Sequence, residues 1–366
     1  MPKPTEVAEI AVNGQRYSNF ETVSVSRSGV DPFPKFAFTA ASPIESAPNW
    51  AGMKLGIGDE CEVILGGRQA ISRGRITGRQ PAYDAQQHGL QIVGTTNSAT
   101  VVRATVDHNK GEFKGYKLSQ IANAALKPYG TKFSTKGDTA GMDQPFEKVA
   151  VQFGETVFAF IERLCRMRNA YILCDKSGDL VGYRLDNAVK TIADLQEGRN
   201  ILAASANFNY EGALSEIQTQ GQRPGNDQRF GDAARDQSAT VKNSSVKQHV
   251  PLVFAAEMPG DQAEMRMRAQ HENGYNLADQ LTVQITVQGW FRDESSLWLE
   301  HVGDPVSVYS PMLFTNDRLN LAIQAVNSTQ GPAGTLSQLT LVLPGAYNGG
   351  DQVQTGGTPP GLYGAA

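Results

Sequence analysis

Acidic residues around a short turn are the first candidates for chemistry in this sequence. Asp175 and Asp179 lie on either side of Lys176-Ser177-Gly178, and Glu147 precedes them. Two carboxylates that face each other across a glycosidic bond can cleave it by acid–base or nucleophilic catalysis. Asp is also common at hairpin turns, where its side chain bonds to nearby backbone N–H groups. We prefer the turn interpretation and predict that the protein is not an enzyme.

The sequence contains a partial dinucleotide-binding motif and a partial zinc-binding motif, and both are incomplete. Gly56-Ile57-Gly58 begins like a dinucleotide-binding turn, yet the third glycine is absent and a strand follows where a helix is needed. His271-Glu272 lacks the second histidine of a zinc-protease helix. The cysteines are Cys61, Cys165 and Cys174, with no Cys-x-x-Cys pair. We expect no metal, no cofactor and no disulfide scaffold, and we expect the thiols to be buried and free.

Basic and aromatic residues offer two further binding hypotheses. Arg163, Arg166 and Arg168 crowd the end of an expected helix and could hold phosphate. Cationic side chains are also favoured at the C-terminal end of a helix, so we interpret them as a solvated helix end. Trp290 and Trp298 could stack on a sugar, as could Trp50. We interpret all three tryptophans as core or corner residues of β domains.

The composition limits the class of protein. A chain of 366 residues is long enough for two to three domains, and its hydrophobic content of 40% is enough for packed cores. A net charge of −4 and a pI near 5.8 argue against specific nucleic-acid binding, which needs a basic surface. No stretch has the roughly 18–20 apolar residues of a membrane helix, and the N-terminus lacks an apolar signal-peptide core. We expect synthesis and folding in the cytoplasm.

The stretch Leu281–Leu343 organises the rest of the chain. Apolar and polar residues alternate over Leu281–Gln288, which predicts a strand with one buried and one wet face. Gly289 and Trp290 end that strand. Further alternating runs follow Gly303-Asp304 and precede Pro344. We therefore predict an antiparallel β unit closed by turns.

A similar unit precedes it in the sequence. Gly58-Asp59 stands before an alternating run, as Gly303-Asp304 does, and three strands with a long penultimate turn follow. A Gly-Asp pair before a strand is also a common turn signal, so chance agreement is the alternative. The order of the features favours a two-copy repeat over chance and over a solenoid. Its signature residues are Trp50, Gly58, Asp59, Trp298, Gly303 and Asp304.

The predicted fold is mainly β with α+β insertions and has two similar, tube-like β-barrel domains. Helical spacing favours helices at Ser119–Lys127 and Glu155–Arg168, and a third over Glu257–Leu277 that is interrupted near Gly274. Thr156 is the expected cap of the second. Asn13-Gly14 is the best hairpin signal. The predicted boundaries are 1–105 for the first barrel, 106–190 for a small α+β domain, 191–222 with 277–345 for the second barrel, 223–276 for an insertion with a polar loop and a helix, and 346–366 for an extended C-terminal tail.

Three stretches resemble one family, the central hub proteins of contractile-tail baseplates of the Mu type, which are related to the hub part of type VI secretion spike proteins. The stretch 151–164 is similar to the helix motif Q-x-x-E-T-x-x-x-F-L-x-R-L of these hubs. The stretch 195–202 is similar to the E-G-x-N-I-L entry to their second barrel. Gly-Trp at 289–290 resembles their closing half, although Phe291 stands where an arginine is expected. The matching residues are Gln152, Glu155, Thr156, Phe160, Arg163, Leu164, Glu197, Gly198, Asn200, Ile201, Gly289 and Trp290.

The resemblance implies a structural role in a virion. Such hubs are homotrimers whose six barrels surround a channel, dock on the hexameric tail tube and hold the trimeric spike, in contact with other baseplate proteins. The protein would be assembled in the host cytoplasm, reside in the tail baseplate and open for DNA ejection during host cell entry. We expect a polar or acidic channel, because arginine-rich walls would bind the genome.

Two alternatives remain open. One is the hub of a tail-like bacteriocin or of a type VI machine. The other is a tail-associated cell-wall-binding or muralytic protein, in which the segment 106–190 would bind glycan.

Overall fold

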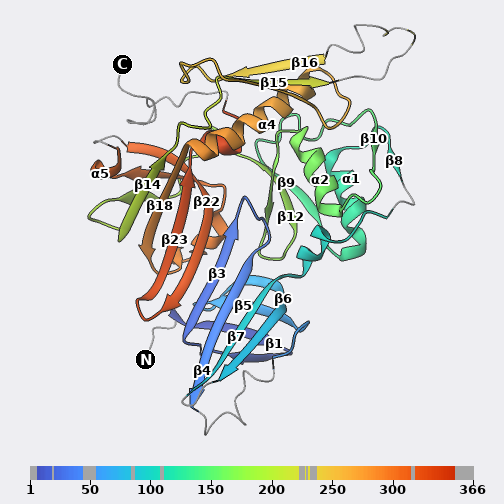
Figure 1. The fold of residues 1–366 in the computed structure, drawn as a ribbon. Helices are drawn as coiled ribbons and strands as arrows, with labels where there is room; N and C mark the ends of the chain where they lie inside the picture. Colours follow the sequence, from blue (N-terminus) through green and yellow to red (C-terminus); the bar gives the residue numbers. More distant parts are fainter. Residues whose placement is uncertain are drawn as a thin grey trace.

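The computed structural model describes residues 6–18, 20–43, 55–83, 87–107, 111–221, 227, 230, 237–314 and 318–350. The fold is mainly β, as predicted, and one large sheet runs through it (Figure 1). Trp50 lies outside the described residues. No helix in the described part of the chain is long and apolar enough to cross a membrane.

The first half of the large sheet comes from the N-terminal residues. Asn13 and Gly14 have positive φ angles of 50° and 77° and join two antiparallel strands, so the predicted Asn-Gly hairpin is confirmed. The half-sheet has the strand order β3-β4-β7-β6-β5-β1-β2. Its strands are β1 (Ala8–Val12), β2 (Gln15–Tyr17), β3 (Thr22–Ser28), β4 (Lys35–Pro43), β5 (Glu60–Leu65), β6 (Arg68–Tyr83) and β7 (Gln87–Thr96).

The second half repeats this order with later strands. The path β14-β18-β23-β22-β21-β13 follows the same sequence of neighbours as β3-β4-β7-β6-β5-β1. Its strands are β13 (Asp194–Gln196), β14 (Ala203–Phe208), β18 (Leu281–Gln288), β21 (Pro305–Tyr309), β22 (Arg318–Gly331) and β23 (Gly334–Val342). The short elements β19 (Phe291–Asp293), β20 (Ser296–Leu297), η7 (Trp298–His301) and α5 (Pro311–Phe314) lie between them.

The two halves form a single sheet because β22 pairs with β3, with Asn327 opposite Ser26. Among the described strands the pairing runs from β14 to β2 without closing, and β21 and β13 branch off at β22. The described part of the sheet therefore does not close into the barrels that the sequence predicts.

The core lies along one face of both halves. In β18 the apolar residues Leu281, Val283 and Ile285 are buried, and the intervening Thr and Gln side chains are more exposed, as alternation predicts. Trp290 is fully buried behind Gly289, and its indole N–H donates to the Thr329 carbonyl (2.9 Å). One apolar cluster spans the two halves. Burial of each large apolar side chain stabilises the fold by roughly 1.5–3 kcal/mol.

The first insertion is a small α+β unit beside the sheet. It contains η4 (Asn97–Val102), β8 (Glu112–Phe113), α1 (Leu118–Leu126), η6 (Lys127–Tyr129), β9 (Phe133–Gly137), β10 (Val149–Ala150), α2 (Val157–Arg166), β11 (Tyr171–Cys174) and β12 (Leu180–Arg184). Both predicted helices and the predicted hairpin β11–β12 are confirmed. Thr156 caps α2 by accepting the Ala159 N–H (3.2 Å). The unit has its own apolar core.

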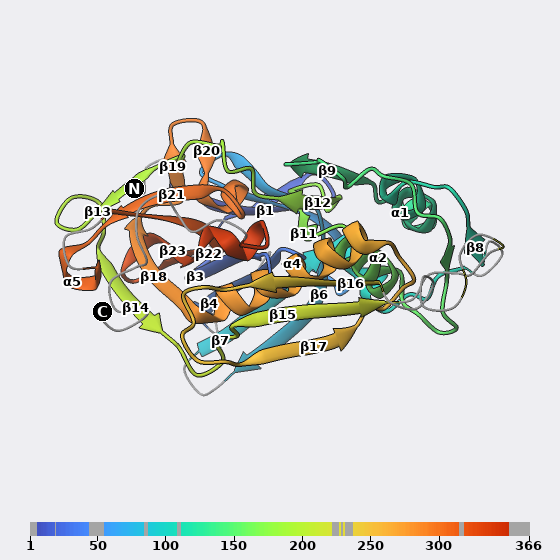
Figure 2. The same ribbon diagram turned by 90° about the horizontal axis from the view of Figure 1, so that it is seen from above.

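The second insertion differs from the prediction. It contains β15 (Glu216–Gly221), β16 (Gln237–Lys242), β17 (Pro251–Ala255) and α4 (Gln262–Gln280). The strand β15 was expected in the second barrel but pairs with β16 and β17 in a separate sheet, which lies over α4 (Figure 2). The helix α4 runs unbroken through Gly274. A Cβ at this position would overlap the Tyr171 hydroxyl, so the glycine makes room for close packing.

The start of the predicted C-terminal tail is packed rather than extended. Pro344–Tyr347 forms the short helix η8, and Tyr347 is buried. Its ring contacts the rings of Tyr171 and Tyr183 edge-on, at centroid distances of 5.4 and 5.8 Å. The tail boundary at 346 is therefore too early.

Candidate functional site

The two Gly-Asp turns have the same backbone structure. Gly58 and Gly303 both have a φ of +95°, which strongly favours glycine. The Gly58 N–H donates to the carbonyl of Ile76 (2.8 Å), and the Gly303 N–H donates to that of Ile323 (2.7 Å). The same turn therefore precedes the hairpin β5–β6 in the first half-sheet and the hairpin β21–β22 in the second.

The aspartates and the following bulges match as well. The carbonyls of Asp59 and Asp304 each accept the N–H of the same isoleucine at 3.0 Å, Ile76 and Ile323 respectively. A register shift follows within two residues in the next pairing of each half, before Gly78 where β6 pairs with β7 and before Ala325 where β22 pairs with β23. Bulges bend and twist a strand, so both units bend at the same place.

The surroundings of the two turns differ. The Tyr183 hydroxyl donates to the Gly303 carbonyl (2.8 Å), and Lys136 lies 3.5 Å from the Asp304 carboxylate. Val302 is buried beside them, whereas Ile57 is 68% exposed. Among the described residues, the first insertion thus covers the turn of the second half and not that of the first. Trp298, in η7 just before this turn, is buried in the common core.

The motif at 152–164 holds the N-terminal end of α2. The carboxylate of Glu155 binds Arg163 through two contacts, Oε1 to Nε (2.7 Å) and Oε2 to Nη2 (2.8 Å). The Gln152 N–H donates to the same carboxylate (3.1 Å), and Arg163 donates to the Ala150 carbonyl (3.0 Å). Phe160 is buried one turn before Arg163, and its ring lies 5.5 Å from the guanidinium. Leu164 is buried next to it.

The motif at 197–201 forms a closed turn between β13 and β14. The Asn200 side chain accepts the Gln196 N–H (2.7 Å) and donates to the Asp194 carbonyl (2.8 Å). Gly198 has a φ of +76°. The Glu197 carboxylate accepts a hydrogen bond from the Ser310 hydroxyl (2.6 Å), and the backbones of Glu197 and Ile201 form an isolated β-bridge. The motif therefore fixes the turn that joins the first two strands of the second half-sheet along the chain.

The arginines in and just after the last turn of α2 are not a solvated helix end. Arg163 and Arg168 are buried, and Arg168 binds the Glu264 carboxylate of α4 (2.6 Å) while its guanidinium lies 3.8 Å above the Phe146 ring. Arg166 is half-buried and pairs with Glu162 (2.8 Å). The prediction was wrong because the acidic partners come from other turns and from α4, which lies 96 residues away for Arg168.

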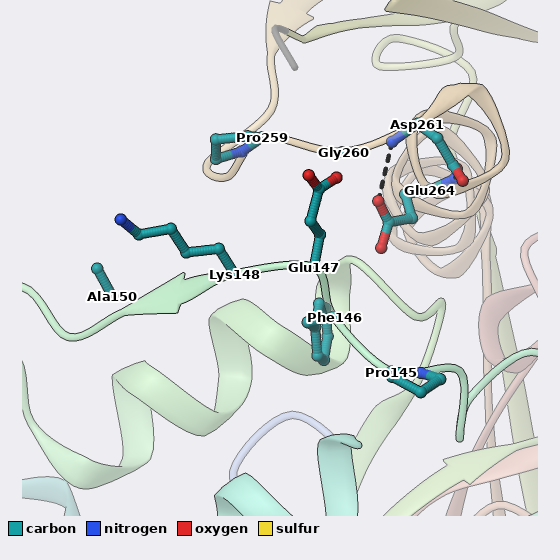
Figure 3. Close-up of a pocket in the computed structure, with 9 residues that line it drawn as sticks. All are labelled: Pro145, Phe146, Glu147, Lys148, Ala150, Pro259, Gly260, Asp261 and Glu264. Carbon is teal, nitrogen blue, oxygen red and sulfur yellow. Dashed lines mark hydrogen bonds between the residues drawn. The ribbon is translucent and has the colours of Figure 1, made fainter. Parts of the chain in front are cut away.

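A pocket of about 180 Å³ lies where α4 meets the first insertion. Figure 3 shows Glu147 pointing toward the loop before α4, with Lys148 directed elsewhere. Asp261 and Glu264 bond to each other's backbone in a capping box at the start of α4. Among the described residues the pocket is lined by Glu147 but by neither Asp175 nor Asp179.

Asp175 and Asp179 serve the hairpin turn, as the sequence favours. Asp175 accepts the N–H groups of Ser177 (2.8 Å) and Asp179 (2.9 Å). Asp179 accepts the Lys132 N–H (3.0 Å) and pairs with Arg73 (2.7 Å). Arg73 also donates to the carbonyls of Ser177 and Gly130, so it ties β6 of the first half to the insertion. An arginine on a strand with mixed polarity carries no sequence signal for this contact.

The three cysteines are free and buried, as predicted. Burial raises the pKa of Cys61 and of Cys174 to about 12. Both thiols are therefore protonated at neutral pH and are weak nucleophiles.

We expect His271 to make the stability of the fold depend on pH. Its ring stacks on Tyr171 at 4.6 Å, and burial, with the nearby positive charges of Arg268 and Arg166, holds its pKa well below 6.5. As the pH falls, His271 therefore takes up a proton in the unfolded chain before it does so in the folded chain. The contribution of the neutral imidazole to stability is complete above about pH 6.5 and falls as the pH drops below that value, by up to about 1.4 kcal/mol per pH unit.

Urea unfolding at several pH values between 7.5 and 5 checks this expectation. The slope of the unfolding free energy against pH should shrink in His271→Gln. It should persist in His249→Gln, because His249 is exposed. An unchanged slope in His271→Gln would show that other groups cause the acid sensitivity.

Comparisons with known proteins find similarity to baseplate hub proteins of phage tails. Residues 98–183 match the family described as baseplate hub protein gp44-like, second domain. The chain is 23% identical over 298 residues to the baseplate hub protein gp44 of Escherichia phage Mu, covering 80% of this chain and 76% of that protein.

Solved structures show the same fold. The 43 kDa tail protein of prophage MuSo2 from Shewanella oneidensis superposes with a TM-score of 0.79 at 23% identity, over 93% of this chain and 99% of that one. A type VI secretion system component from E. coli superposes with a TM-score of 0.55 at 12% identity, over 97% and 80%. Residues 98–183 thus match the gp44-like baseplate hub family, and most of the chain is similar to the baseplate hub protein gp44 of phage Mu.

Proposed function

We propose that this chain is the central hub of a contractile baseplate, where a homotrimer joins the six-fold tail tube to the three-fold spike. The duplication carries the proposal: two half-sheets with one strand order and one turn geometry lie side by side. Three such chains present six similar tube-like units around an axis. One kind of surface can then meet six tube subunits.

The ends of the sheet support assembly into a ring. β14 forms one end of the described sheet. Near the other end, the ladder between β5 and β6 stops at Arg75, while β6 continues along β7 to Tyr83. Open strand edges are templates for pairing with another chain. We propose that these two regions of neighbouring copies meet in the trimer.

The polar face of the sheet supports a role as channel wall. We use "polar face" for the side opposite the core, where two rows of opposed residues cross five strands from β14 to β3. Every residue of these rows is small or carries an uncharged polar group. The rows are Ala203, Thr286, Gln338, Asn327 and Ser26, and Ser205, Gln284, Thr340, Ala325 and Ser28.

The charges that continue the first row are paired. Beyond Ser26 the row reaches Lys35 and Arg75. Lys35 forms an ion pair with Asp31, and Arg75 lies 3.7 Å from the Glu60 carboxylate. Binding of DNA grows with the number of phosphates that free cations neutralise. We propose that DNA passes this face without being held.

A proline in β14 tests the ring. The Asn209 N–H donates to the Gln280 carbonyl of the β18 side, and backbone groups alternate along an antiparallel strand. The N–H of Ser205 therefore faces β18, and that of Ala204 points away. Ala204→Pro should leave the half-sheet folded but remove a donor from its open edge.

Light scattering measures the mass of the assembly in solution. The unaltered protein should have three times the chain mass of 39.5 kDa, alone or after the spike is added. Ala204→Pro should shift it to the monomer, and Ala204→Ser, which keeps the N–H, should not. A wild-type protein that stays a monomer with every trimeric partner would contradict the proposed function.

A further inference from the structure

The two Gly-Asp turns share one backbone structure, but the described residues cover only one of them. We propose that the open turn, Ile57-Gly58-Asp59, is the docking site of the three-fold spike. The spike would place an aromatic side chain against Gly58 and a basic side chain beside Asp59. This inference rests on the proposed trimeric hub and assigns one of its contacts to named residues.

The covered turn shows which chemistry fits. At Gly303 an added Cβ would lie 2.7 Å from the Tyr183 ring and 3.2 Å from Leu173, so aromatic and aliphatic groups fill the space that glycine leaves. The Tyr183 hydroxyl donates to the Gly303 carbonyl, and Lys136 approaches Asp304. The hairpin β11–β12 with β9 therefore supplies an aromatic hydroxyl, an apolar contact and a cation.

The open turn presents the same groups without this cover. An added Cβ at Gly58 would meet no heavy atom of the described residues within 4 Å, and Ile57 is 68% exposed where its counterpart Val302 is 2% exposed. Asp59 takes the place of Asp304, and Glu60 and Glu62 follow on β5. An exposed apolar side chain beside acidic groups is complementary to a partner with apolar and basic groups.

Symmetry selects the spike over the tube. A six-fold partner must find the same surface on all six units of the ring. The first insertion covers the turn in the second half of every chain, so a trimer presents three open turns. Three equivalent sites match a three-fold partner.

The experiment uses biolayer interferometry to measure the affinity of the full-length hub for the purified trimeric spike protein of the same phage. Ile57→Asp puts a negative charge where the partner's cation approaches and should weaken binding at least about tenfold, as for a central contact. Ile57→Ser, which adds no charge, should weaken it less. Val30→Asp is the matched control, because Val30 is also apolar and exposed and lies between β3 and β4. Its affinity should stay within about twofold.

The outcomes separate this inference from the proposed function. If all variants are trimers and Ile57→Asp binds the spike as tightly as the wild-type protein does, the docking site is wrong and the hub role stands. A wild-type protein that neither trimerises nor binds the spike overturns both. Thermal melting of each variant verifies that the exposed substitutions leave the fold intact.

Discussion

Arg163→Met should lower the free energy of unfolding by about 3–5 kcal/mol. The side chains of Arg163 and Glu155 are 10% and 8% exposed, and two short contacts join them. Removal of the cation leaves a buried carboxylate without its main partner, which costs more than the intact pair contributes. Urea unfolding, followed by hydrogen exchange of α2, measures the loss.

Two further variants identify the cause. Glu155→Gln combined with Arg163→Met removes both charges and should cost clearly less than the sum of the single changes. Arg166→Ala is the matched control from the same helix, because Arg166 is 34% exposed in its pair with Glu162. It should cost about 1 kcal/mol or less. Equal losses in Arg163→Met and Arg166→Ala would contradict a special role for the buried pair.

Local patterns in the sequence predict much of the fold. The alternation over Leu281–Gln288 indicates β18 and its buried face, and Asn13-Gly14 indicates the hairpin β1–β2. Thr156 was expected to cap α2 and does so. Each of these features depends on residues a few positions apart, so a short window contains the relevant physics.

Distant partners account for most of what was missed. The pairing of β22 with β3, which joins the two halves, brings together residues about 300 positions apart, such as Ser24 and Asn327 (2.8 Å). Neither strand has a local property that specifies the other. The same holds for Arg168, whose partner Glu264 lies on α4. A helix end rich in arginine looks solvated unless its distant acids are known.

Gly274 shows how a tertiary contact reverses a local inference. Glycine weakens an isolated helix, so a break in Glu257–Leu277 was expected. In the structure α4 continues, and the missing Cβ leaves room for Tyr171 of β11. Gly274 therefore allows close packing rather than a helix break. This role could be inferred only if the position of β11 were known.

Gly303→Ala should destabilise the fold by about 2–5 kcal/mol. About 1–2 kcal/mol come from the positive φ, which a side chain with a Cβ tolerates poorly. A further 1–3 kcal/mol or so come from overpacking, since the new methyl group would lie 2.7 Å from the Tyr183 ring. The hydroxyl of Tyr183 would also be pushed away from the Gly303 carbonyl.

Gly58→Ala is the internal control, because the chain offers the same turn twice. Its φ is also +95°, but in the part of the chain that the structure describes no heavy atom lies within 4 Å of the new methyl group. Only the backbone cost of about 1–2 kcal/mol should appear in its urea or thermal unfolding. The difference between the two variants isolates the contact between the first insertion and the second half-sheet. Equal losses would mean that the insertion does not hold this turn, and the asymmetry that distinguishes three units of the proposed ring from the other three would lose its structural basis.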